Sequence, residues 1–139
     1  MASYNKFQQF VEDLGNKVHN LDADAISIYL SNATPSASSD AIKTDLAEIS
    51  TGNGYTGAID ITASYSQTTG TGSLTDGGDS TVTASGGSVG PFRYVPLFNN
   101  TPTSPVDPLI GWWDHGSAVT LASGESFTVQ YGATVFTIA

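Results

Sequence analysis

The chain has 139 residues, no cysteine and a formal net charge of −9, from 13 acidic and 4 basic side chains. Without cysteine it has neither a disulfide framework nor a thiolate metal site, so its stability has to come from apolar burial and hydrogen bonding. A chain of this length buries roughly two thirds of the surface that its unfolded state exposes. We therefore predict a single domain over residues 1–139.

The distribution of basic residues disfavours nucleic acid and anionic membranes as partners. Lys6, Lys17 and Lys43 lie in the first third of the chain, and Arg93 is the remaining base. Surfaces that follow phosphates or anionic headgroups need clustered basic side chains. No apolar run approaches the roughly 20 residues of a membrane span, and the first residues lack the apolar region of a signal peptide. We expect a soluble protein that is made in the cytoplasm.

The N-terminal segment predicts an amphipathic helix over about residues 4–20. Phe7, Phe10 and Leu14 recur at helical spacing, and Val18 extends the same apolar stripe. Such a helix either docks on the chain's own sheet or reaches out as an arm onto a neighbouring subunit, because terminal elements are easily exchanged between protomers. The sequence leaves both interpretations open.

A strand and a second helix are expected next in the chain. Residues 25–30 alternate between apolar and polar side chains, as a half-buried strand does. Residues 40–49 predict a short helix, because Ile42, Leu46 and Ile49 fall on one side of it. The N-terminal third is therefore expected to hold two short α-helices.

The pattern after Tyr55 is almost wholly that of β-structure. Loops rich in Gly, Ser and Thr are expected at residues 67–79 and 85–90, with too little apolar content to bury themselves. Gly132 is either a turn between two strands or a bulge within one strand, and the bulge is slightly favoured. Strands are expected at residues 58–66, 80–84, 92–98, 109–114, 119–121, 126–131 and 133–138. The predicted fold class is mainly β.

The sequence shows no catalytic, metal-binding or cofactor-binding motif. A hydrolytic triad needs a histidine held by an acid, and the chain offers His19 and His115. His115 follows Asp114, but neighbours on a strand point to opposite faces, which is poor geometry for an orienting pair. His19 is expected on the surface. We predict that the protein is not an enzyme and has no catalytic residue, metal ligand or cofactor.

Aromatic residues and one arginine form the candidate interface. Trp112 and Trp113 are adjacent, so a strand places them on opposite faces. An exposed tryptophan is typical of a subunit contact or of a sugar platform. Arg93 is expected to make a forked pair with an acid such as Asp114 or Asp107. The candidate interface residues are Phe7, Phe10, Arg93, Trp112 and Trp113.

Several segments together resemble a known class of protein. They are the helix at residues 7–14, Gly-Pro-Phe-Arg-Tyr-Val at 90–95, Pro-Leu-Ile-Gly-Trp-Trp-Asp at 108–114 and the hairpin that leads into 127–129. This arrangement resembles the head decoration (cement) proteins of tailed bacteriophages. The resemblance implies a β-sandwich, with the jelly roll as a candidate topology, and no catalytic residues. It also implies a dimer or trimer that binds the major capsid protein on the outer surface of the shell.

Two functions follow as expectations. The first is a virion structural protein, made in the bacterial host cytoplasm, that decorates and stabilises the capsid as a homo-oligomer. The alternative is a receptor- or glycan-binding module of a tail or fibre. The alternative predicts an exposed Trp112 or Trp113 in a shallow groove, with measurable affinity for saccharides.

Overall fold

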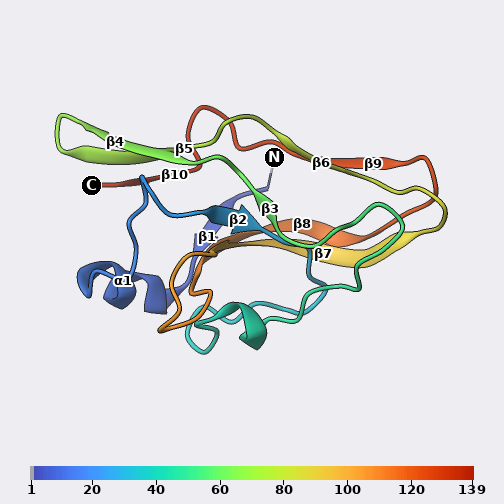
Figure 1. The fold of residues 1–139 in the computed structure, drawn as a ribbon, viewed down its shortest axis with the longest axis horizontal. Coiled ribbons are helices and arrows are strands. Elements are labelled where there is room, and N and C mark those ends of the chain that lie inside the picture. Colours follow the sequence, from blue (N-terminus) through green and yellow to red (C-terminus); the bar gives the residue numbers. More distant parts are fainter. Residues whose placement is uncertain (1) are drawn as a thin grey trace.

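The computed structural model describes residues 2–139 and is built mainly from antiparallel strands (Figure 1). The largest sheet has the strand order β1-β8-β7-β2-β3. Two smaller sheets have the orders β10-β5-β4 and β6-β9. The strands are β1 (Tyr4–Lys6), β2 (Ile26–Ile28), β3 (Ile59–Asp60), β4 (Ser64–Thr68), β5 (Thr71–Thr75), β6 (Ser80–Thr83), β7 (Val89–Asn99), β8 (Leu109–Leu121), β9 (Ser126–Val129) and β10 (Phe136–Ile138). The predicted mainly β fold is confirmed.

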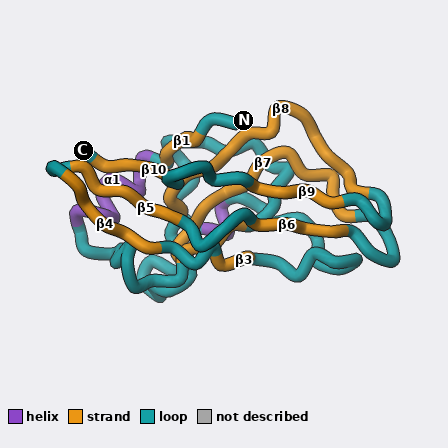
Figure 2. Tube along the Cα trace, turned by 90° about the horizontal axis from the view of Figure 1, so that it is seen from above, coloured by secondary structure: helices purple, strands orange, loops and turns teal. Residues whose placement is uncertain are grey.

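The sheets are arranged in two layers. In Figure 1 the two smaller sheets run along the top, and the five-stranded sheet lies beneath them. Seen from above in Figure 2, the β10-β5-β4 sheet and the β6-β9 sheet follow one another along the length of the molecule. The 3-10 turn η1 (Lys43–Asp45) lies below the larger sheet in Figure 1, and the helix α1 (Gln8–Gly15) lies at the left end of the molecule. The larger sheet is therefore covered on both faces over part of its area.

Alternation along the strands of the larger sheet separates two apolar clusters. One cluster contains Leu97 and Ile110 together with Leu74 and Val129 of the smaller sheets. The other cluster contains Phe7, Tyr29, Leu46, Phe98 and Leu109. Successive strand residues point to opposite faces, so neighbours such as Leu97 and Phe98 enter different clusters. A strand that is buried on both faces reads as a continuous apolar run, which is why β7 is readable in the sequence.

The N-terminal helix is shorter than predicted. The sequence predicted helix over about residues 4–20, but α1 covers Gln8–Gly15 and the residues before it form strand β1. In the register of this strand, Tyr4 pairs with Trp113 and Lys6 pairs with Gly111. A Cβ atom at Gly111 would clash with the Tyr4 ring. The glycine therefore lets the Tyr4 ring lie against the β8 backbone, and this tertiary contact overrides the helical pattern.

The predicted second helix at residues 40–49 is wrong. The structure has a 3-10 turn there, and α1 is the single α-helix among residues 2–139. The backbone of this segment pairs with the sheet instead, because Leu109 N donates to Ala41 O and Ile49 N donates to Leu30 O. Once the backbone groups have these distant partners, local helix propensity no longer decides the conformation.

Several expected strand boundaries also differ from the structure. The segment expected as a loop at 67–79 contains β5, in which Leu74 is fully buried. Residues 58–66 divide into β3 and β4, which belong to different sheets. The strands expected at 109–114 and 119–121 are one strand, β8. The register of its pairing with β7 shifts between Asp114 and Val119, so the residues between them stay within the strand. Gly132 is not a bulge within one strand, since β9 and β10 lie in different sheets.

Among residues 2–139, no helix has both the length and the apolar character needed to cross a membrane.

Candidate functional site

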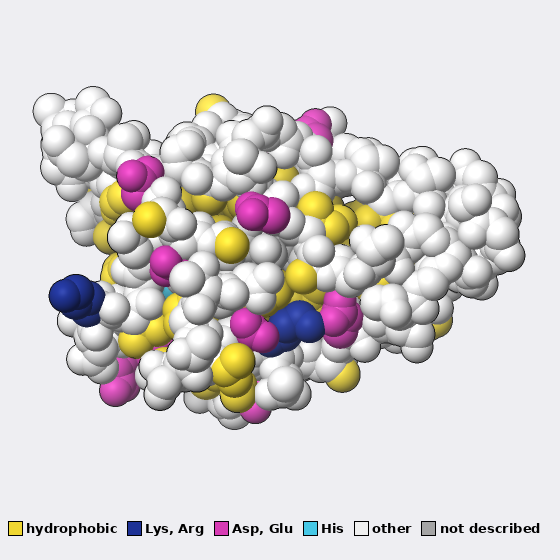
Figure 3. All heavy atoms as spheres, in the orientation of Figure 1, with side chains coloured by type: hydrophobic (Ala, Val, Ile, Leu, Met, Phe, Trp, Pro, Cys, Tyr) yellow, Lys and Arg dark blue, Asp and Glu magenta, His cyan; other side chains and the backbone are white. Residues whose placement is uncertain are grey.

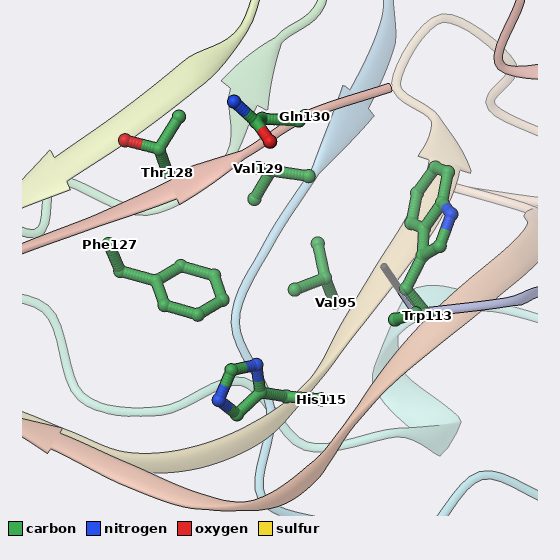
Figure 4. Close-up of a pocket in the computed structure, with 8 residues that line it drawn as sticks. Val95, Trp113, His115, Phe127, Thr128, Val129 and Gln130 are labelled. Carbon is green, nitrogen blue, oxygen red and sulfur yellow. The ribbon is translucent and has the colours of Figure 1, made fainter. Parts of the chain in front are cut away.

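A cavity opens between the two layers where β8 faces β9. Its volume is about 250 Å³. Val95 comes from β7, Trp113 and His115 come from β8, and Phe127 comes from β9. The remaining lining residues are Ala2, Thr128, Val129 and Gln130. Figure 4 shows the Phe127 and His115 rings on one side of Val95 and the Trp113 indole on the other.

Strand alternation places these side chains. Trp113 and His115 are two residues apart on β8 and therefore point to the same face. The His115 ring meets the Phe127 ring at a centroid distance of 5.4 Å and an interplanar angle of 74°. This is an edge-to-face contact, which aromatic rings favour over direct stacking. The cavity is therefore bounded by aromatic groups that come from both layers.

The two tryptophans lie on opposite faces of the sheet, as the sequence predicted. Trp113 packs between Tyr4 and Tyr131, with centroid distances of 5.6 Å and 5.7 Å. Trp112 lies against Phe7 on the other face, with a centroid distance of 4.6 Å. Both indoles are half-buried. Each ring is held in the chain's own packing and is not displayed as a flat exposed platform.

Arg93 forms the forked pair that the sequence predicted, and its partner is Asp114 rather than Asp107. The Arg93 Nε donates to Asp114 Oδ1 at 2.8 Å, and Nη2 donates to Oδ2 at 3.1 Å. The Gly116 amide also donates to Asp114 Oδ1. The hydrogen bond from Arg93 holds the pKa of the Asp114 carboxyl below its usual value. The hydrogen bonds of Asp114 therefore go to Arg93 and Gly116, and none joins it to His115 in the described chain.

Phe7 and Phe10, which were candidates for an interface, lie inside the chain. Their exposed fractions are 0% and 2%. The Phe10 ring packs edge-on against Phe136 of β10 at 5.7 Å. Of the two interpretations of the N-terminal segment, the structure matches the one in which it docks on its own sheets. The candidate interface residues at the surface are therefore Arg93, Trp112 and Trp113.

A buried polar cluster surrounds His19, which was expected on the surface. The His19 side chain is only 8% exposed. The Asn99 amide donates to His19 Nδ1 at 3.0 Å and to Asp24 Oδ2 at 2.7 Å. Nε2 of His19 and Oδ2 of Asp13 are buried without a hydrogen-bond partner in the described chain. Sequence reasoning missed this cluster, because Asn99 is far from His19 along the chain and no local pattern joins them.

The buried His19 is expected to make folding depend on pH. Burial of the ring lowers the pKa of His19 below its ordinary value of 6.5, against the opposing charges of Asp13 and Asp24. The unfolded chain therefore takes up a proton at a higher pH than the folded chain does. The free energy of unfolding is greatest above the unfolded-state pKa and falls as the pH is lowered through the folded-state pKa.

Urea unfolding at about pH 7.5 and about pH 5.5 measures this effect through linkage. His19→Gln should reduce the loss of stability between the two conditions. His115→Gln is the matched control and should keep the loss, because the His115 ring lies at the surface. Equal losses in the wild type and His19→Gln would show that His19 is not the group responsible.

Within residues 2–139, no three side chains from His, Asp and Glu gather closely enough to hold a metal ion. The cavity offers aromatic and apolar contacts from Val95, Trp113 and Phe127, and polar groups from His115, Thr128 and Gln130.

No family model matches the chain, no curated protein matches it, and no solved structure matches its fold.

Proposed function

We propose that this chain is a structural protein of a tailed-phage virion that decorates the capsid by binding the major capsid protein. The observation that carries the proposal is the aromatic-lined cavity between β8 and β9, with Trp113, His115 and Phe127 around it. Protein interfaces concentrate their binding energy where an anchor side chain enters a well-packed pocket, and aromatic groups are enriched there. The cavity offers such a pocket for a side chain of a neighbouring subunit.

The size of the cavity favours a protein side chain over a small-molecule ligand. Pockets for drug-sized ligands and cofactors range from about 300 to about 1,000 Å³. The cavity of about 250 Å³ lies below that range. One aromatic or large aliphatic side chain from a partner is of a suitable size to enter it.

The packing of the tryptophans weighs against the alternative, a glycan-binding tail or fibre module. A sugar platform presents an aromatic face to solvent, but Trp113 is flanked by Tyr4 and Tyr131, and Trp112 lies against Phe7. Protein contact therefore has more support than glycan binding.

The proposal includes the architecture and assembly that the resemblance to decoration proteins implies. We propose that the two layers form a β-sandwich, with the jelly roll as its candidate topology, and that the chain acts as a dimer or trimer on the capsid surface. A protein that binds the assembled lattice and not its free parts stabilises the lattice by mass action. The net charge of −9 keeps free copies apart before assembly, because like-charged molecules repel.

Filling the cavity from its border tests this proposal. Ala2 lines the cavity, whereas its neighbour Ser3 does not line it and is exposed. Ala2→Trp should fill the cavity and weaken binding to purified heads at least about tenfold, equivalent to about 1.4 kcal/mol. Ser3→Trp adds the same ring beside it and should bind as the wild type does. Co-sedimentation with heads of the phage that encodes the chain measures both variants.

Two results would contradict the proposal. One is unchanged binding of Ala2→Trp to the heads. The other is binding of the wild-type chain to a saccharide array but not to heads, which would support the glycan-binding alternative.

A further inference from the structure

A second surface feature lies on the side of α1 that faces β10. Two cavities of about 290 Å³ and about 650 Å³ both include Leu14 and Ile138 in their linings, so they meet there. We call the combined feature the α1–β10 groove and define it by Lys6, Val11, Leu14, Lys17, Phe136 and Ile138. None of these residues lines the cavity between β8 and β9. The α1–β10 groove is thus a separate surface.

One wall of the α1–β10 groove is the free edge of a sheet. β10 is the outer strand in the order β10-β5-β4, and its ladder is made with β5. No other backbone hydrogen bond in the described chain involves residues 136–138. An unpaired edge of this kind is a ready template for another extended segment.

The opposite wall is apolar and exposed. Val11 of α1 has 54% of its surface exposed, and the other large hydrophobic residue exposed to a similar degree is Val106. Val11 and Leu14 lie three residues apart on the helix, which places them on one side of it. A segment lying along β10 would therefore have an apolar helix surface beside it.

The α1–β10 groove contains two lysines, Lys6 and Lys17, and its lining also includes the acids Asp22 and Asp24. Acidic side chains are scattered over the face in Figure 3, where basic ones are sparse. Lys43 and Arg93 are paired with Glu48 and Asp114. Within residues 2–139, Lys6 and Lys17 make no ion pair, and both are exposed. The two bases without an ion pair in this acidic chain thus belong to the same groove.

Two acids near Lys17 already accept hydrogen bonds from the chain. Asp22 Oδ1 accepts from the Tyr65 amide at 3.1 Å. Asp24 Oδ2 accepts from the Asn20 amide at 2.8 Å and from the Asn99 side chain. Both carboxylates keep their charge and line the groove beside Lys17, but neither forms an ion pair with it among residues 2–139.

We propose that the α1–β10 groove binds an extended peptide segment of a partner protein, in which acidic and apolar residues alternate. The segment adds as a strand to the free edge of β10, as in other complexes formed by strand addition. Its apolar side chains contact Val11 and Leu14, and its carboxylates meet Lys6 and Lys17. This inference does not depend on the proposed virion function, because it concerns a different surface and a different contact.

The probe for the test is a fluorescein-labelled heptapeptide of alternating aspartate and valine, and its binding is followed by fluorescence anisotropy. We expect saturable binding to the full chain. Replacing the aspartates by lysine should abolish binding, and N-methylation of the peptide amides that face β10 should do so too, because strand addition needs those donors. A peptide with serine in place of valine should also bind more weakly.

Variants of the chain locate the binding site. Lys6→Glu and Lys17→Glu should each weaken binding about fivefold, near the upper limit for an exposed ion pair. Val11→Ser should weaken binding about threefold or more through lost apolar contact. Val106→Ser is the matched control, since it removes a similarly exposed valine elsewhere, and it should bind as the wild type does. Ala2→Trp, which fills the other cavity, should also leave peptide binding unchanged.

Three outcomes would overturn the inference. One is equal binding of the acidic and the lysine-substituted peptides. Another is unchanged binding of N-methylated peptide, which would exclude strand addition. The third is self-association of the chain that Val11→Ser abolishes, in the absence of peptide binding, which would assign the groove to a second copy.

Discussion

Replacing Phe7 by alanine is expected to lower the free energy of unfolding by about 3–5 kcal/mol, the usual cost of removing a buried phenylalanine side chain. Phe7 is 0% exposed and packs against Trp112 at 4.6 Å, in the cluster that also contains Tyr29 and Phe98. Its amide donates to Ile110 O, so the backbone is fixed as well and the cavity left behind collapses poorly. Urea unfolding measures the change.

Val11→Ala is the matched control for this prediction. Val11 lies four residues further along and is 54% exposed, so its truncation should change stability by no more than about 0.5 kcal/mol. A Phe7→Ala chain that unfolds like the wild type but no longer binds heads would show that Phe7 contacts a partner, as the arm interpretation of the N-terminal segment held.

Replacing Tyr55 by phenylalanine should cost about 2–3 kcal/mol, the loss expected when a buried donor is left without a partner and a bond to a charged group is removed. The Tyr55 hydroxyl accepts from the Leu30 amide at 3.0 Å and donates to Glu48 Oε1 at 2.7 Å. Burial raises the pKa of Tyr55 above its ordinary value, so the hydroxyl keeps its proton. This single oxygen joins the segment under the sheet to the backbone just after β2.

Tyr65→Phe is the matched control for Tyr55. The Tyr65 hydroxyl has no hydrogen-bond partner in the described chain, and the side chain is half-buried. Its removal should change the urea midpoint little. If the two substitutions cost the same, the hydroxyl of Tyr55 does not hold the segment in place.

The sequence predicts well those elements whose burial shows directly in the pattern of apolar residues along one strand. β7 is recognisable because its residues are buried on both faces of the sheet. The opposite orientation of Trp112 and Trp113 follows from strand alternation. The sequence also predicted that Arg93 pairs with an acid, and the structure selects Asp114 from the two candidates, Asp114 and Asp107. The burial of β7 and the orientation of the two tryptophans need only short-range periodicity.

The elements that the sequence predicts poorly depend on distant contacts. β5 has a single large apolar residue, Leu74, and becomes a strand because β4 and β10 flank it. The segment at 40–49 has helical spacing, but its backbone is bonded to Leu109 and Leu30. His19 is buried beside Asn99, which no local pattern indicates. In each case the deciding partner is remote in the chain.

The position of the chain in an intact phage particle tests the central claim most directly. Cryo-electron microscopy of purified particles should show it on the outer surface of the head, with the cavity between β8 and β9 occupied by a side chain of the major capsid protein. A chain located in the tail or absent from the particle would contradict the account, as would a head-bound chain whose cavity faces solvent.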